Sequence, residues 1–440
     1  MANIIVVKTP AEAALADAYG GLNTVLPGTG GVRDLREGAI ARFRVSGLPH
    51  RRIEEWKYTD LRNLMRDANP IVMEPQGQLT AAGKAEDFLS GVEHIRLVVV
   101  DGAYSPALSN ASALPAGLHV TSLAEALAKG DREVIDSLST AAPDNAAFDL
   151  NTAFMSDGVV ISVDKGAEIA LPVAIETRHS ASTPQATFTR SLVVLGAASK
   201  LTLIDSYEGP DGAAHQTNAA LTLKVGDGAQ LHRISFQAHG LEAQHISSLL
   251  VSLGKQAQLR SFAIEAGAAL ARNQVFVAYD GDNAKALIAG ATLLSGTRHA
   301  DTTLVVDHTA LGGESRELFK AVIDGEARSV FQGKIVVRPG AQKTDGRMMS
   351  QSLLLSETAE ADAKPELEIF ADDVQCGHGA TCGALDEDLL FYCKARGIPQ
   401  AEAEAILVQA FVGEAIETVE NEALREKLNA LTEAWLGKRV

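Results

Sequence analysis

Cysteine is scarce in this chain, with three among 440 residues. All of them lie near the C-terminus, at Cys376, Cys382 and Cys393. Three cysteines cannot form a disulfide framework, and their clustering fits reduced thiols in a cytosol better than pairing in a secreted protein. We therefore expect a cytoplasmic protein.

Long apolar runs and an excess of basic residues are also missing. Apolar runs such as residues 249–253 are far shorter than the ~20 residues that a membrane helix needs, and residues 1–8 lack the basic region and apolar core of a signal peptide. The 39 Lys and Arg against 56 Asp and Glu give a formal charge of −17. Without a long basic run, unassisted binding to nucleic acid or to an anionic membrane is not expected.

The usual catalytic motifs do not occur. The chain has no phosphate-binding loop, because Gly333-Lys334 is followed by Ile335 and has no matching upstream glycine. A dinucleotide fingerprint, a His-Glu-x-x-His helix and a Gly-x-Ser-x-Gly turn are missing as well. The sequence therefore predicts a protein that is not an enzyme.

What the chain does contain is a repeated turn motif between short strand-like runs. Variants of Gly-Asp-Gly-Ala-Gln-Leu begin at positions 164, 196, 226, 254 and 281, so the period drifts between about 27 and 32 residues. A period in this range is typical of a solenoid whose coils bury apolar faces against one another. The repeating unit is β, which favours a β-helix, and a β-sandwich is the alternative.

These patterns divide the chain into three parts. Residues 1–150 mix helical and strand-like segments, residues 151–370 form the β core, and residues 371–440 form a C-terminal helical domain. In the last part, Asp386 is placed to cap one helix and Gly397 to end it. Two further apolar stripes at helical spacing follow, the second ending near Trp435.

The best candidates for metal chemistry are Cys376, His378, Cys382 and Cys393, because thiolate and imidazole hold zinc and iron–sulfur species. Their spacing argues against one structural zinc site, and Cys393 falls in a predicted helix, where we expect it to pack in the core. If Cys376 and His378 share a strand, both lie on one face and form a half-site, which needs further ligands from a partner or a transient cargo. A buried cysteine beside a hydrogen-bonded histidine, and a self-sufficient zinc site, remain the alternatives.

Several segments in combination make the chain resemble the SufB/SufD family of the SUF iron–sulfur cluster assembly machinery. The segments are Glu54–Thr59, Asn151–Phe154, Ser329–Ile335, Ala341–Gly346, Leu353–Glu357, Lys364–Ile369 and Asp373–Thr381. Within the family, the form Cys376-Gly-His-Gly-Ala-Thr381 resembles the SufD branch, and no upstream cysteine corresponds to the SufB cluster ligand.

The resemblance implies a right-handed parallel β-helix between an N-terminal α/β region and a C-terminal helical domain. It further implies a non-catalytic scaffold that pairs with a SufB-like subunit through the β-helices and binds a SufC-like ATPase through the C-terminal domain. When isolated, the chain would pair with a second copy of itself as a homodimer. A transient iron–sulfur cluster would lie at the SufB interface near His378, with Cys376 and Cys382 as neighbours and no cofactor held tightly by the chain alone. We expect the ATPase to contact Leu389, Phe391, Tyr392, Arg396, Ile406 and Phe411.

Departures from the family pattern leave alternatives. Cys382 stands where a small apolar residue such as valine is expected, and the Phe391-Tyr-Cys393 sequence is shared with SufB-type chains, so a SufB-type paralogue is the second choice. A β-helical carbohydrate-active enzyme is a third. The aromatic content of 5% and the lack of an evident carboxylate cluster on the repeats count against it.

Overall fold

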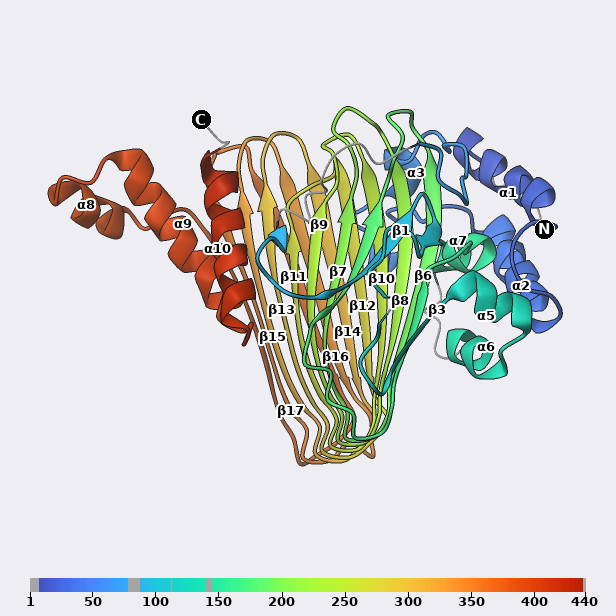
Figure 1. Cartoon of the computed structure of the whole chain (residues 1–440). Coiled ribbons are helices and arrows are strands. Elements are labelled where there is room, and N and C mark those ends of the chain that lie inside the picture. The colour runs from blue at the N-terminus through green and yellow to red at the C-terminus, as the bar shows by residue number, and fades with distance from the viewer. Residues whose placement is uncertain (1–7, 78–87, 112, 140–144, 438–440) are drawn as a thin grey trace, which may run out of the picture.

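The structure, a computed structural model, describes residues 8–77, 88–111, 113–139 and 145–437. From Val159 onward the chain alternates between two sheets and pairs each strand in parallel with the strand one coil away, which is the arrangement of a parallel β-helix (Figure 1). The predicted β-helix is confirmed, and the sandwich alternative is excluded because from β4 onward each strand pairs in parallel with the strand one coil away and not with the next strand in the sequence. Two antiparallel pairs, β1 with β2 and β3 with β4, lie at the N-terminal end of the sheets.

The strands fall into two groups. The ten-stranded sheet contains β1 (Ile95–Val100), β2 (Ala103–Ser105), β5 (Val173–Arg178), β7 (Lys200–Glu208), β9 (Gln230–Ala238), β11 (Gln258–Glu265), β13 (Lys285–Leu294), β15 (Glu314–Ile323), β17 (Asp345–Leu354) and β19 (Gln375–Gly383). The nine-stranded sheet contains β3 (Leu118–Ser122), β4 (Val159–Val163), β6 (Ala186–Leu195), β8 (Gln216–Val225), β10 (Gln244–Leu253), β12 (Leu270–Tyr279), β14 (His299–His308), β16 (Arg328–Val337) and β18 (Glu360–Ile369). The sheets therefore extend on both sides of residues 151–370.

The repeated motif forms the turn that joins the two sheets at one end of each coil. Its third residue has a positive φ in all five copies: Gly166 (72°), Ala198 (57°), Gly228 (65°), Gln256 (55°) and Asn283 (58°). Glycine and asparagine adopt this left-handed conformation readily, and other residues adopt it at some cost. The motif recurs because every coil needs this turn. The spacing between successive copies changes because the coils differ in length.

The main core lies between the sheets and is built by alternation along each strand. Leu203, Leu223, Leu253 and Ile335 are among its fully buried members. Because side chains alternate between the two faces of a strand, every second residue points into the helix interior. The register of one coil against the next therefore decides which side chains meet inside.

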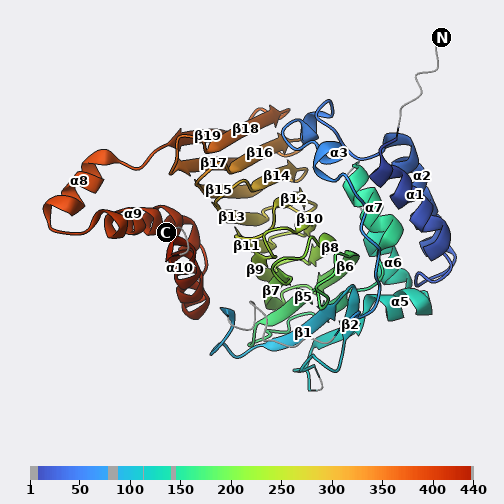
Figure 2. The same ribbon diagram turned by 90° about the horizontal axis from the view of Figure 1, so that it is seen from above.

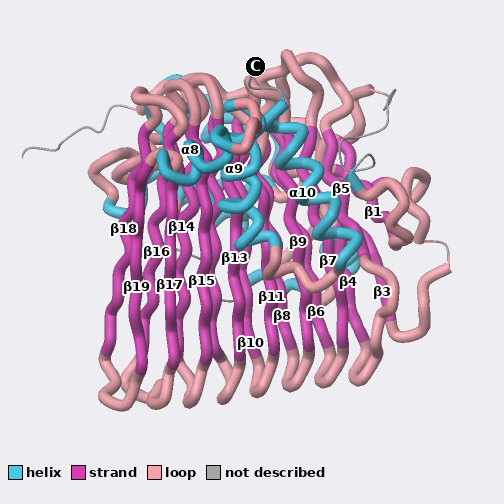
Figure 3. The backbone as a smooth tube through the Cα atoms, turned by 90° about the vertical axis from the view of Figure 1, so that its left-hand side faces the viewer, coloured by secondary structure: helices cyan, strands magenta, loops and turns pink. Residues whose placement is uncertain are grey.

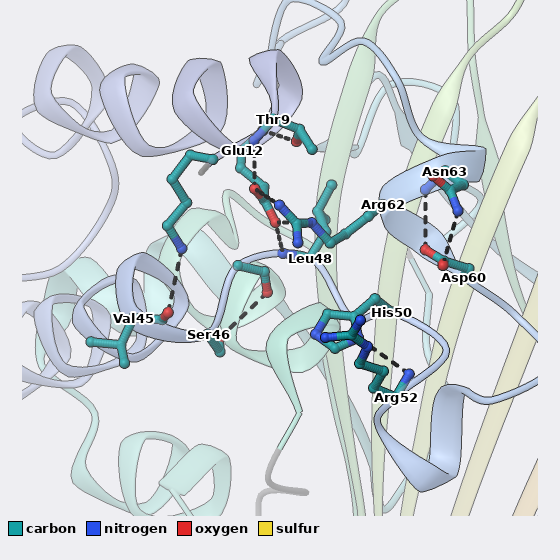
Figure 4. Close-up of polar contacts among 12 residues, drawn as sticks. Thr9, Glu12, Val45, Ser46, Leu48, His50, Arg52, Asp60, Arg62 and Asn63 are labelled. Carbon is teal, nitrogen blue, oxygen red and sulfur yellow. Dashed lines mark hydrogen bonds and ion pairs between the residues drawn. The ribbon is translucent and has the colours of Figure 1, made fainter. Parts of the chain in front are cut away.

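Helices of the N-terminal region lie beside the nine-stranded sheet, where α7 contacts β6 and β8 (Figure 2). They are α1 (Pro10–Leu22), α2 (Gly31–Ser46), the 3-10 turn η1 (Glu54–Trp56), α3 (Leu61–Leu64), α5 (Leu123–Lys129), α6 (Arg132–Ser139) and α7 (Ala146–Phe154). The buried carboxylate of Glu12 joins the first segments: it accepts from the backbone N–H groups of Thr9 (2.7 Å) and Leu48 (2.8 Å) and pairs with Arg62 (3.1 Å) (Figure 4). The predicted α/β character of this region is confirmed.

Three C-terminal helices follow the last strand: α8 (Glu387–Ala395), α9 (Gln400–Ile416) and α10 (Glu422–Gly437). The Asp386 side chain accepts from the N–H of Leu389 (3.0 Å) as the N-cap of α8, and Gly397 follows its end with φ 82°, as predicted. α9 packs on β13 and β15, whereas α8 projects away from the sheet (Figures 1 and 2). Within the described residues, no helix has the length and apolarity needed to cross a membrane.

Candidate functional site

The last coil of the β-helix is uncovered. β19 ends the ten-stranded sheet beside β17, and β18 ends the nine-stranded sheet beside β16 (Figure 3). Most residues of β18 and β19 are exposed or half-buried, whereas nearly every inward residue of the preceding coils is buried. A strand edge with unpaired backbone groups is a ready surface for pairing with another chain.

Cys376 and His378 lie on the inward face of this last strand. Cys376 stands opposite Gly346, and His378 stands opposite Met348, which belongs to the main core. Cys376 is half-buried against that core, and His378 is exposed because no further coil covers it. The two residues are thus on one strand and one face, as the half-site interpretation requires.

The other two candidates are placed differently. Cys382 stands opposite Ser352 on the same inward face of β19 and is exposed. Cys393 lies on α8, where it is half-buried, and α8 has no buried residue. The expectation that Cys393 packs in a helix core is therefore wrong, because α8 projects from the molecule instead of packing on the sheet.

The surroundings of Cys376 favour a neutral thiol. Burial raises the pKa of this thiol above its usual value, and the nearby carboxyls of Asp345 and Glu317 raise it further. Across the described ranges, no group of three or more His, Cys, Asp or Glu side chains is arranged to hold a metal ion. One thiol and one imidazole are ligands that suit zinc or iron–sulfur species, and alone they supply two of the four positions such centres use.

An apolar rim borders the uncovered coil. Ile369, at the end of β18, is 41% exposed, Phe370 is 59% exposed, and Met349 on β17 is 38% exposed. Exposed large apolar side chains close to an open strand edge are typical of a protein interface. Sequence reasoning missed these residues, although the Ile369-Phe370 pair directly before the cysteine motif was a usable signal.

A second exposed apolar surface lies on α8 and the start of α9. Leu389, Phe391, Tyr392 and Ile406 are between 41% and 73% exposed, and the Arg396 guanidinium lies 3.4 Å from the centroid of the Tyr392 ring. Phe411 is placed differently from the other five predicted contact residues. It is half-buried in the contact between α9 and the sheet.

Lys320 fixes the position of Phe411. The ammonium group of this buried lysine on β15 lies 4.5 Å from the centroid of the Phe411 ring and is bound by Glu414 and Gln351. Phe411 therefore contributes to holding α9 on the β-helix.

A groove of about 840 Å³ opens between α2, η1, α7 and the outer face of the nine-stranded sheet. Trp56, Phe276 and Val305 contribute apolar surface to it. Three of its cations are paired within the chain: Arg42 with Asp149 (2.6 Å), Lys334 with Glu368 (3.0 Å) and Arg338 with Asp307 (2.8 Å). The groove gave no sequence signal, because its walls come from segments far apart in the chain.

Comparison with known proteins matches almost the whole chain. Residues 176–411 match the family model described as SUF system FeS cluster assembly, SufBD core domain, and residues 29–175 match the SufBD protein N-terminal region. The chain is 30% identical over 405 residues to an iron–sulfur cluster assembly SufBD family protein of Synechocystis, covering 89% of this chain and 88% of the relative. It is 30% identical over 388 residues to the iron–sulfur cluster assembly protein SufD of Escherichia coli, covering 88% of each chain.

A plant relative extends the match. Protein ABCI7, chloroplastic, of Arabidopsis thaliana is 27% identical over 407 residues, covering 89% of this chain and 84% of that protein. Both family models fall on the parts of the structure described above, the core model on the β-helix with the start of the helical region and the other on the N-terminal region. The chain belongs to the SufBD family of the SUF iron–sulfur cluster assembly system.

Proposed function

We propose that this chain is a SufD-type scaffold subunit that pairs with a SufB-type subunit through its uncovered last coil. The observation that carries the proposal is the position of β19, an edge strand whose inward face presents Cys376 and His378. The E. coli relative that shares 88% coverage with the chain is named as SufD, an iron–sulfur cluster assembly protein. Family membership itself supports a role in iron–sulfur cluster assembly.

The arrangement of ligands supports a shared, transient cluster. Cys376 and His378 contribute one thiolate and one imidazole, and the partner's edge supplies the remaining ligands in the closed interface. Because a cluster needs more ligands than this chain provides, the isolated chain does not hold one tightly. In this role the chain positions and protects the cargo and catalyses no reaction of its own.

ATP hydrolysis belongs to a separate SufC-type subunit in this proposal. We place its docking surface on α8 and the start of α9, where Leu389, Phe391, Tyr392 and Ile406 are exposed. α8 has no buried residue, so these side chains remain available for a partner. The missing phosphate-binding loop in the sequence is consistent with this division of labour.

The test is co-expression with the SufB-type and SufC-type subunits of the same organism, followed by anaerobic purification. The chain is expected to co-purify with both subunits, and the His378→Ala variant to form the complex but carry much less iron and sulfide. His119→Ala is the matched control, because His119 is an exposed histidine on β3 at the other end of the β-helix. Unchanged cluster content in His378→Ala contradicts the ligand role, and failure to co-purify contradicts the scaffold role.

A further inference from the structure

Glu317 lies in the same inward-facing row as His378. In the register of the ten-stranded sheet, Glu317 on β15 stands opposite Met348 on β17, and Met348 stands opposite His378 on β19. On its other side Glu317 stands opposite Ile288 on β13. Ile288 and Met348 both belong to the core between the sheets, so the whole row points into the β-helix.

The Glu317 carboxyl is buried and has no ion-pair partner among the described residues. The residue is 2% exposed, and its carboxyl oxygens form no well-aligned hydrogen bond within the described part of the chain; the Ser315 hydroxyl, two residues away on the same strand face, is its polar neighbour. The polar groups around it make other bonds in part: Nε2 of His308 and Oγ of Ser315 share a hydrogen bond of 3.1 Å, and the Tyr279 hydroxyl donates to the Glu314 carbonyl (2.7 Å). Nδ1 of His308 is buried without a hydrogen-bond partner among the described residues.

The nearest cation in sequence does not neutralise Glu317. Arg316 is adjacent, and its side chain therefore points to the opposite face of β15, where it pairs with Asp345 (2.7 Å). An ionised carboxylate without a partner is strongly disfavoured in such a site, so the group stays protonated. Burial accordingly raises the pKa of Glu317 to about 8, against smaller opposing effects of Ser315 and Arg316.

A buried, protonated acid of this kind can become negatively charged, and it lies two coils behind the half-site. Met348 separates Glu317 from His378, so Glu317 is not a metal ligand in this arrangement. Once ionised, Glu317 acts on β19, because its carboxylate is among the groups that raise the pKa of Cys376. A cation held on the inward face of β19 has the converse effect and favours the ionised form of Glu317.

We propose that Glu317 is a charge-compensating residue for the site of Cys376 and His378, protonated while the site is empty and ionised when a cationic iron species is bound there. The inference rests on the proposed function. It assigns to Glu317 an electrostatic effect on the site, exerted through the interior of the β-helix. Glu317 is thus a positioning residue for charge, two coils behind the strand that carries the ligands.

The proton balance is simple. On binding, the O–H bond of Glu317 breaks, the proton passes to solvent and the carboxylate charge remains inside; no electron is transferred. The Cys376 thiol releases a proton of its own when it becomes a thiolate ligand. The other titratable groups near Glu317 are His308 and Tyr279 from the nine-stranded sheet and Asp345 and His378 from the following coils of its own sheet.

The test measures protons released on binding of Co²⁺ to the complex with the SufB-type and SufC-type subunits. Anaerobic titration calorimetry in two buffers with different ionisation enthalpies gives the number of protons released per ion. The Glu317→Gln complex is expected to release one proton fewer than the wild type and to bind Co²⁺ several-fold more weakly, because the compensating carboxylate charge is missing. Cys376→Ser in the same experiment identifies the proton that belongs to the thiol.

Glu265→Gln is the matched control. Glu265 on β11 is also a buried carboxyl with one unpartnered oxygen, and burial raises its pKa to about 7. In register, Thr292, Ala321 and Ser352 separate it from β19. This variant is expected to release the same number of protons as the wild type.

Each outcome separates the inference from the function on which it rests. If the wild-type complex binds no Co²⁺ at the half-site, so that Cys376→Ser changes nothing, the proposed function fails. If it binds but Glu317→Gln releases as many protons as the wild type, the inference alone is overturned. Infrared difference spectra of the wild type, which need no variant, are expected to lose a protonated-carboxyl C=O band on metal binding; an unchanged band also overturns it.

Discussion

The Arg272 guanidinium lies 4.1 Å from the centroid of the Trp56 ring and pairs with the carboxylate of Asp301. Both charged side chains are 0% exposed. Arg272 also donates to the backbone carbonyl of Glu55 (2.7 Å), so one side chain on β12 binds the N-terminal turn η1 to the β-helix. This contact attaches the N-terminal region to the middle of the β-helix.

Asp301→Ala is expected to lower the free energy of unfolding by about 3–5 kcal/mol, because it leaves the Arg272 charge buried without its partner. Urea denaturation followed by tryptophan fluorescence measures the change, since Trp56 lies at the contact. Asp307→Ala, which removes the exposed pair with Arg338, is the control and is expected to cost less than about 1 kcal/mol. Equal effects of the two substitutions contradict the importance of the buried pair.

Buried imidazoles in the N-terminal half of the β-helix, far from β19, predict that the folded protein loses stability in acid. His179 and His215 are stacked with ring centroids 4.2 Å apart, and His245 lies nearby beside His239. Burial lowers the pKa of His179 and His215 below 6.5 and that of His245 to about 3. Since the unfolded chain binds these protons more readily, stability is full above pH 6.5 and falls as the pH drops from 6.5 toward 3.

The measurement is the urea midpoint as a function of pH between 7.5 and 5, a window chosen around the ordinary histidine pKa of about 6.5. Each of these histidines contributes up to about 1.4 kcal/mol per pH unit. His245→Gln is expected to make the pH dependence shallower, and His119→Gln, an exposed histidine, to leave it unchanged. A pH dependence that His245→Gln does not alter disproves the assignment.

Glu317→Gln is expected to stabilise the chain at neutral pH. The folded-state pKa of about 8 lies above the ordinary glutamate value, so ionisation favours the unfolded state and the penalty grows as the pH rises from 4.5 to 8. The expected gain is about 3 kcal/mol at pH 7 and close to zero at pH 4. Thermal unfolding at both pH values checks it, and a gain of the same size at pH 4 is the contrary result.

The C-terminal surface separates binding from stability. Phe391→Ala is expected to abolish co-purification with the SufC-type subunit and to change the free energy of unfolding by less than about 0.5 kcal/mol, since Phe391 is 73% exposed. Phe411→Ala is the informative comparison. It removes the ring under Lys320 and is expected to loosen α9 and lower stability. Retained SufC binding in Phe391→Ala places the docking surface elsewhere.

The β-helix can be predicted from the sequence because the turn in each coil is formed by residues that are neighbours in the chain. A coil closes through one left-handed residue, and that need is visible in the third position of each motif, such as Gly228 and Asn283. The C-terminal helices are predicted for the same reason, since the cap of Asp386 and the stop at Gly397 act within one turn. The shared face of Cys376 and His378 follows from strand periodicity alone.

Relationships between coils could not be predicted in the same way. The row that joins Glu317, Met348 and His378 depends on strand register, and a period that drifts between coils hides which residues face each other. The inward turn of Phe411 depends on how α9 meets the sheet, and the partial burial of Cys393 depends on α8 packing on α9 instead of on the sheet. Helical spacing identifies an apolar face, but it does not say which part of that face the sheet covers.

The uncovered coil at β19 has a consequence for the balance of protein synthesis in the cell. An open strand edge pairs with the nearest compatible edge, and for a surplus chain that edge belongs to another copy of itself. Copies paired in this way would cover Cys376 and His378 and keep them from the proposed SufB-type partner. If the proposed pairing holds, the ratio in which the two subunits are translated, together with the relative affinities of like and mixed pairs, sets how many mixed assemblies form.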